Sequence, residues 1–140
     1  MGVGMKEQVR IGIDPGVKTG YARSVNRKLV ELKCLDFWDA YDEILKHDPA
    51  DIFLVSVEVS NVSHVWHQKK NIRSAAKVGQ HVGAVRREGE LLVLRLVALG
   101  YAVRAVNPRG KINSDRFKKI TGWEGRTNEH TRDAGMLSIR

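Results

Sequence analysis

The sequence predicts an α/β fold in which a mixed five-stranded sheet is flanked by helices. Two observations support this fold class. Three strand-like segments follow one another closely near the N-terminus, as in an antiparallel meander, and two later strand-like segments each follow a helical pattern, as strands joined by helical crossovers do. The sheet would therefore combine a three-strand antiparallel meander with two helix-linked strands.

Apolar periodicity and turn residues place the individual elements. The expected order is strands near 8–14, 19–25 and 28–36, a helix near 38–47, a buried strand near 51–59, a long helix over about 71–99, a strand at 102–106, a helical turn near 114–121 and a last helix from 128. Asp48-Pro49 ends the first helix and Gly100 closes the long one, whereas Asn128 is a plausible cap for the last.

Length and composition favour one compact domain over residues 1–140. With 140 residues, of which 42% are hydrophobic, the chain can bury a single core, and it contains no internal repeat and no Pro/Gly/Ser-rich linker. No apolar stretch reaches membrane-spanning length and no secretory signal is present, so we expect a cytoplasmic protein without a membrane partner. The only cysteine, Cys34, lies in an apolar alternation and is expected to be a small buried side chain.

The segment IGIDPGVKTGYA at residues 11–22 contains the most informative acid of the chain. Apolar residues alternate with polar or small ones up to Ile13, as in a strand, and Pro15-Gly16 then turns the backbone sharply. Asp14 therefore lies at a strand-turn junction. An acid in this position either caps the turn or contributes to a phosphate or metal site.

Three further residues favour a metal site. Glu58 almost closes the apolar run IFLVSVEV at 52–59, where a carboxylate is costly to bury without a partner. His130 and Asp133 stand three residues apart at the start of the last helix, so their side chains share one face. Magnesium and manganese ions prefer hard oxygen ligands and keep positions open for phosphate oxygens and water. Asp14, Glu58 and Asp133 offer such oxygen ligands, and His130 completes the candidate set with a ring nitrogen.

In this order and spacing, the segments resemble the RuvC-type Holliday-junction resolvases, which are nucleases of the ribonuclease H-like superfold. The resemblance rests on DPGVKTGYA, on the glutamate of VSVEVS, on the central KVGQHVGAV and on the closing HTRDAGML, and it extends from about Val9 to Ile139. It implies a ribonuclease H-like fold. It also implies that two divalent ions are bound by Asp14, Glu58, His130 and Asp133.

The function that the resemblance implies is a Mg²⁺- or Mn²⁺-dependent endonuclease that cleaves branched DNA such as four-way junctions. Two metal ions would bridge the scissile phosphate and the products would carry 5′-phosphate ends. A homodimer would match the near two-fold symmetry of a junction. The small size would suit a phage-borne enzyme, which would act in the cytoplasm of its host.

The distribution of charge also favours nucleic acid as the partner. The formal net charge is +8, no acid occurs between Val59 and Arg87, and a second basic stretch at 104–126 contains only two acids. One basic run is often only a solvated face, but two such runs would flank the carboxylates. Lys111 also resembles a lysine that the family places near the scissile phosphate. The residues expected to contact DNA are Trp66, Lys69, Lys70, Arg73, Arg109, Lys111 and Lys118.

Trp66 is the first aromatic residue after Glu58. Members of the family tend to carry an aromatic residue sooner after this glutamate, where it can wedge into a junction, whereas positions 59–63 here read Val-Ser-Asn-Val-Ser. Trp66 could stack on an unpaired nucleobase or could simply pack against the protein.

A stripe of small residues marks the long helix. Ala75, Gly79 and Gly83 recur at four-residue spacing, which lets another backbone approach closely. The stripe would face either this chain's own sheet or the dimer partner, as in the family.

Two other functions remain open. A nuclease of the same superfold that acts on RNA or on RNA–DNA hybrids would have the same metal site. A nucleotide-binding phosphotransfer module would also use an Asp-x-Gly turn for phosphate, but such modules need two domains around a cleft.

Overall fold

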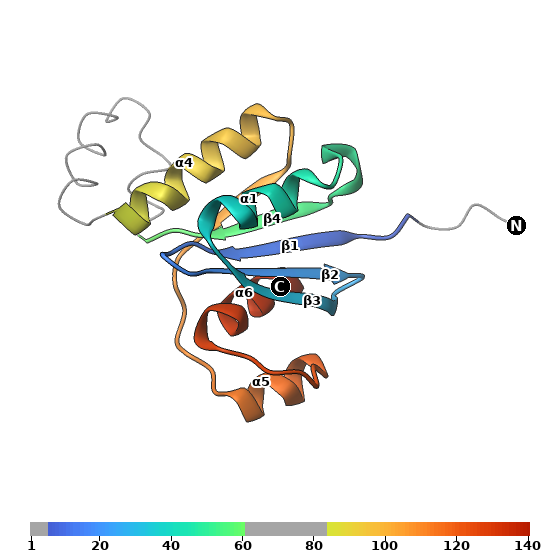
Figure 1. Ribbon diagram of the computed structural model, residues 1–140. Helices are drawn as coiled ribbons and strands as arrows, with labels where there is room; N and C mark the ends of the chain where they lie inside the picture. Colours follow the sequence, from blue (N-terminus) through green and yellow to red (C-terminus); the bar gives the residue numbers. More distant parts are fainter. Residues whose placement is uncertain (1–5, 61–83) are drawn as a thin grey trace, which may run out of the picture.

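The computed structural model describes residues 6–60 and 84–140, which form a mixed five-stranded sheet with helices on both faces (Figure 1). Across the sheet the strand order is β3-β2-β1-β4-β5. The strands are β1 Val9–Asp14, β2 Thr19–Val25, β3 Lys28–Leu35, β4 Leu54–Glu58 and β5 Val103–Val106. Strands β1 to β3 pair antiparallel, whereas β4 pairs parallel with β1 and β5 parallel with β4. The predicted meander with two helix-linked strands is confirmed.

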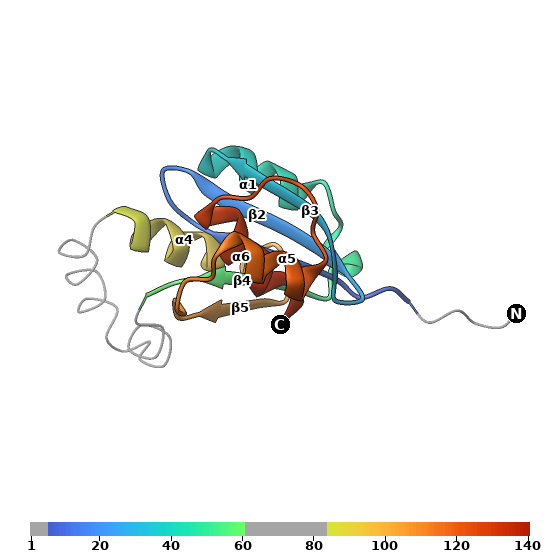
Figure 2. The same cartoon turned by 90° about the horizontal axis from the view of Figure 1, so that it is seen from below.

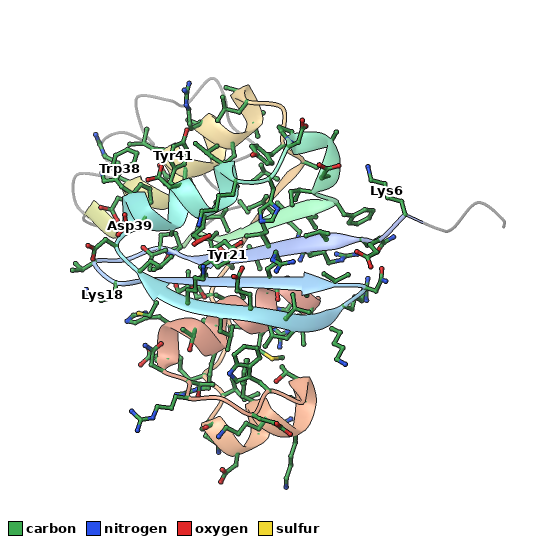
Figure 3. The ribbon with its side chains drawn as sticks, turned by 45° about the vertical axis from the view of Figure 1, so that its right-hand side comes forward. Lys6, Lys18, Tyr21, Trp38, Asp39 and Tyr41 are labelled. Atoms are coloured by element: carbon green, nitrogen blue, oxygen red, sulfur yellow. The ribbon has the colours of Figure 1, made fainter. Side chains whose placement is uncertain are left out.

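Four α-helices flank this sheet in the part of the chain that the structure describes. They are α1 Phe37–Leu45, α4 Ala84–Ala98, α5 Ser114–Thr121 and α6 Glu129–Ile139. Helices α1 and α4 cover one face and α5 and α6 the other, and the view in Figure 2 shows α6 lying across the sheet. Figure 3 shows Trp38 and Tyr41 on α1, on the side of the sheet opposite α6.

The alternation of side chains along the strands divides the core into two clusters. On the α1 and α4 face, Ile11, Ile13 and Tyr21 pack with apolar residues of both helices. On the other face, Ala22 packs with Phe117 of α5 and with α6 residues that include Ala134. Because both faces of the central strands are covered, β1 is buried along nearly its whole length and can hold a carboxylate at its end away from bulk water.

Most element boundaries agree with the prediction, and the departures have local causes. Strand β4 begins three residues later than expected, because Pro49–Asp51 forms a short 3₁₀ helix whose first turn is capped by the Asp48 side chain, which accepts a hydrogen bond from the amide of Ala50 at 2.9 Å. The cap predicted for the last helix is confirmed, since the amide of Thr131 donates to the side chain of Asn128 at 2.8 Å. Gly100 follows α4 with φ of 98°, a conformation that glycine adopts without strain.

One expectation about burial is wrong. Cys34 is exposed. It lies on β3, an edge strand of the sheet, where the side chains are only partly covered and the apolar alternation overstates burial.

Several predicted features lie outside the described residues. They are the first part of the long helix, which the structure describes from Ala84 as α4, and the residues Trp66, Lys69, Lys70, Arg73, Ala75, Gly79 and Gly83. Within the described ranges, no helix is long and apolar enough to cross a membrane.

Candidate metal centre

Two glycines let α6 lie directly on the sheet. A Cβ atom at Gly12 of β1 would stand 2.1 Å from the main-chain oxygen of Ala134, and one at Gly20 of β2 would stand 2.0 Å from that of His130. Side-chain carbons do not approach backbone oxygens so closely, so only glycine permits this packing. The close approach brings the first turns of α6 to the end of β1, where Asp14 is located.

Three carboxylates from three elements meet at this end of the sheet. Asp14 ends β1 and Glu58 ends β4, and because these strands are parallel neighbours, their last residues lie at the same edge. Asp133 reaches them from α6. One oxygen from each carboxylate lies within 4.8 Å of the other two, and the side chains of Asp14 and Asp133 are only 9% and 10% exposed. This triad could hold a metal ion, since hard oxygen ligands suit Mg²⁺ and Mn²⁺.

Burial and mutual repulsion oppose ionisation of the triad. Burial raises the pKa of Asp14, and the charge of Asp133 adds to the effect. Burial, the hydrogen bond from Glu58 to Asp14 and the charge of Asp14 together raise the pKa of Glu58 to about 8. Glu58 therefore keeps a proton at neutral pH unless a cation offsets the repulsion. A divalent ion would displace that proton, so metal binding and proton release are coupled here.

This coupling predicts the pH dependence of stability without added metal. The pKa of Glu58 is about 8 in the folded protein against 4.5 as its ordinary value, so the folded state binds more protons and stability should fall as pH rises from about 4.5 to about 8. Thermal unfolding in EDTA across this range tests it. Glu58→Gln, which cannot ionise, should lose less stability than the parent, and parallel pH profiles for the two proteins would contradict the assignment.

His130 lies at the rim of the triad. Its Nδ1 is 3.3 Å from Oδ2 of Asp14, and its side chain is 44% exposed. The mutually close set of oxygen ligands does not include it. The predicted four-residue cluster is thus brought together around Asp14, with three buried or partly buried carboxylates and one more exposed imidazole.

Lys111 bridges Asp133 of the triad and a second acid of α6, Glu129. Its Nζ donates to Asp133 Oδ2 at 2.6 Å and pairs with Glu129 Oε1 at 2.8 Å, and these hydrogen bonds raise the pKa of Lys111 and lower that of Glu129. Sequence reasoning predicted Lys111 but missed Glu129. An acid in the first turn of a helix is favourable for the helix dipole alone, so no signal in the sequence singled it out.

A pocket adjoins the triad. Its lining includes Glu58 and Asp133 of the triad, the two arginines Arg109 and Arg140, and the apolar side chains of Met136 and Leu137 on α6. Arg109 was expected to contact DNA, whereas the sequence gave no reason to select Arg140. The remaining predicted contact, Lys118, is exposed on α5.

Gly89 places α4 against the same end of the sheet. A Cβ atom there would lie 3.2 Å from Val59 and 3.3 Å from the main-chain oxygen of Glu58. Helix α4 thus passes close behind the end of β4 on the face opposite α6.

Comparison of the sequence with protein-family models and with curated proteins found no match.

Proposed function

We propose that the protein is a metal-dependent endonuclease of the RuvC type, with a ribonuclease H-like fold, that cleaves branched DNA such as Holliday junctions in the cytoplasm. The observation that carries the proposal is the convergence of Asp14, Glu58 and Asp133 from two parallel strands and the helix that crosses them. The sheet order supports the fold assignment, because an antiparallel meander is extended by two helix-linked parallel strands and the acids end the first and fourth strands.

The oxygen ligands of the triad suit a divalent ion, and we propose that the site holds a pair of such ions. Bound Mg²⁺ or Mn²⁺ would activate a water molecule and stabilise the leaving 3′ oxygen, which yields 5′-phosphate ends. Asp14, Glu58 and Asp133 would supply oxygen ligands, and His130 would add a nitrogen ligand at the rim. Lys111, held by Glu129, would place a positive charge where a substrate phosphate approaches the triad.

The exposed side chains of α4 support a homodimer. Leu94 and Val97 lie on α4 and are 60% and 49% exposed, so this helix presents apolar surface that is available to a partner chain. Two copies would present two metal centres to the two strands of a junction.

A charge placed on this face should separate the dimer. We expect Leu94→Glu to shift the protein from dimer to monomer in sedimentation velocity, with an unchanged circular dichroism spectrum, because a carboxylate would be buried in an apolar seam. Asp42→Glu, an exposed change on α1, is the control. A Leu94→Glu protein that remains dimeric would rule out this face.

A substrate panel tests the proposed function against its alternatives. Labelled four-way junction, flap, linear duplex and RNA–DNA hybrid should each be incubated with Mg²⁺, Mn²⁺ or EDTA, and then in competition. We expect the junction to be cleaved and to be the strongest competitor. Preferred cleavage of the hybrid would point to the other class of nuclease. A nucleoside triphosphate is assayed in parallel, and phosphate release from it without DNA cleavage would point to a phosphotransfer module.

His130 should set the preference for metal. A neutral imidazole is a softer ligand than a carboxylate, and with it the centre carries one negative charge fewer. Mn²⁺ should therefore support cleavage better than Mg²⁺. His130→Asp should retain cleavage and shift the preference toward Mg²⁺, whereas His130→Ala should be severely impaired. Initial rates of junction cleavage in each metal are the measurement. If the alanine variant cleaved like the parent in both metals, His130 would have no part in the site.

A further inference from the structure

We propose that Arg109 and Arg140 form a subsite that binds a phosphate of the substrate strand next to the scissile phosphate. The inference deepens the proposed nuclease function and rests on it for the identity of the ligand as DNA. The subsite is the arginine-lined part of the pocket that adjoins the carboxylate triad.

The pocket is lined by both acidic and basic side chains. Glu58 and Asp133 belong to the triad and also line this pocket, so the pocket lies next to any phosphate that reaches the triad. Arg109 comes from the segment after β5, and Arg140 follows the last turn of α6. A guanidinium presents several donors in a planar fork that suits phosphate oxygens.

The positive charges of Arg109 and Arg140 repel each other, and an anion bound between them would reduce this repulsion. Burial and the charge of Arg109 lower the pKa of Arg140, which places the two side chains in one electrostatic neighbourhood. Among residues 6–60 and 84–140, no carboxylate forms an ion pair with either of them. A bound phosphate would relieve this repulsion, and its oxygens would accept hydrogen bonds from both groups.

The backbone that carries Arg140 is fixed independently of its side chain. The main-chain oxygen of Arg140 accepts hydrogen bonds from Arg10 of β1 and from Arg104 of β5, each at 3.4 Å. Arg104 is itself anchored, since it donates to the Ser56 hydroxyl at 2.9 Å. The end of α6 is therefore held to the sheet, and the Arg140 side chain can be replaced without releasing it.

The spacing is compatible with a phosphate next to the scissile one. Asp133 lies on α6 and Arg140 directly follows that helix, seven residues later, which corresponds to about 10 Å along the helix axis between the two backbones. A phosphate that neighbours the scissile one along the strand suits this separation. Met136 and Leu137 line the pocket, and the small exposed part of each offers apolar surface for the sugar or base between the two phosphates.

The first test measures how junction binding depends on salt. With EDTA present to prevent cleavage, Arg109→Gln/Arg140→Gln should bind the junction at least about tenfold more weakly at low salt, and the log–log slope of affinity against salt should fall by up to about 0.9 for the lost phosphate contact. Arg27→Gln is the matched control, because Arg27 is an exposed arginine in the β2–β3 turn, at the opposite end of β2 from the triad. The control should keep the parental slope. A double variant that matches the control would overturn the subsite.

The second test removes the charge from the DNA instead. Junctions that carry one neutral methylphosphonate are scanned across the positions that flank the cleaved bond. At one position the substitution should weaken binding by the parent but not by the double variant, because both changes remove the same contact. Additive losses at every position would overturn the subsite.

These binding measurements distinguish a failure of the proposed subsite from a failure of the proposed nuclease function. If the parent cleaves junctions and the double variant binds like the control, the nuclease function stands and the subsite is wrong. If the parent never cleaves but the double variant shows the predicted fall in the log–log slope, the phosphate subsite stands and the nuclease function is wrong.

Discussion

Asp14→Asn should abolish cleavage of a four-way junction while leaving junction binding intact or tighter. The variant loses a buried carboxylate that we propose to bind metal, whereas the basic groups proposed to contact DNA remain. We expect the single-turnover rate to fall by at least about a thousandfold, in line with the several kcal/mol that metal-ion catalysis supplies. Glu58→Gln should behave in the same way.

Two observations make this result interpretable. Asp42→Asn, which removes an exposed carboxylate from α1 on the opposite face of the sheet, should leave the rate unchanged. Asp14→Asn should also be more stable than the parent in EDTA at about pH 8, because it removes repulsion from the buried cluster. Substantial cleavage by Asp14→Asn would remove Asp14 from the active site.

Adding a methyl group at Gly12 or Gly20 should be the most damaging change to the fold. At either position the new Cβ would stand about 2 Å from a main-chain oxygen of α6, so the helix would have to move. We expect Gly20→Ala to lower the free energy of unfolding by roughly 3 kcal/mol or more, at the upper end of overpacking effects, because the neighbour is backbone and cannot rotate away. Urea unfolding followed by circular dichroism gives the value.

Gly110→Ala provides the matched control for stability, since no atom lies within 4 Å of a Cβ at that position. It should change the free energy of unfolding by less than about 0.5 kcal/mol. Gly20→Ala protein that remains folded should also lose cleavage, because displacement of His130 and Asp133 opens the site. A Gly20→Ala variant as stable and active as the parent would contradict the close packing of α6.

The fold was largely predictable because local patterns agree with the tertiary structure. Val9 to Ile13 alternates as a strand, Asn128 caps the last helix, and the meander is fixed by short turns. The prediction was weaker where tertiary context decides the outcome. Cys34 is exposed because its strand is at the edge of the sheet, and the turn at Pro49–Asp51 shortened β4.

The carboxylates of the candidate site could be predicted from the sequence, but the residues that surround them could not. A carboxylate at the end of an apolar strand is visible in the sequence, so Asp14 and Glu58 could be selected. Gly12 and Gly20 give no such signal, because glycine in a strand has several causes and only the position of α6 identifies this one. The pairing of Lys111 with Glu129 and the place of Arg140 in the pocket likewise depend on how α6 crosses the sheet.

We propose that the triad of Asp14, Glu58 and Asp133 is a metal-dependent centre for cutting branched DNA. The most direct measurement is incubation of the purified protein with a labelled four-way junction in Mn²⁺, in Mg²⁺ and in EDTA, with the chemistry of the product ends determined. We predict paired nicks on opposing strands with 5′-phosphate ends, in the presence of metal only. Cleavage that persists in EDTA, or an intact junction in both metals, would contradict the account.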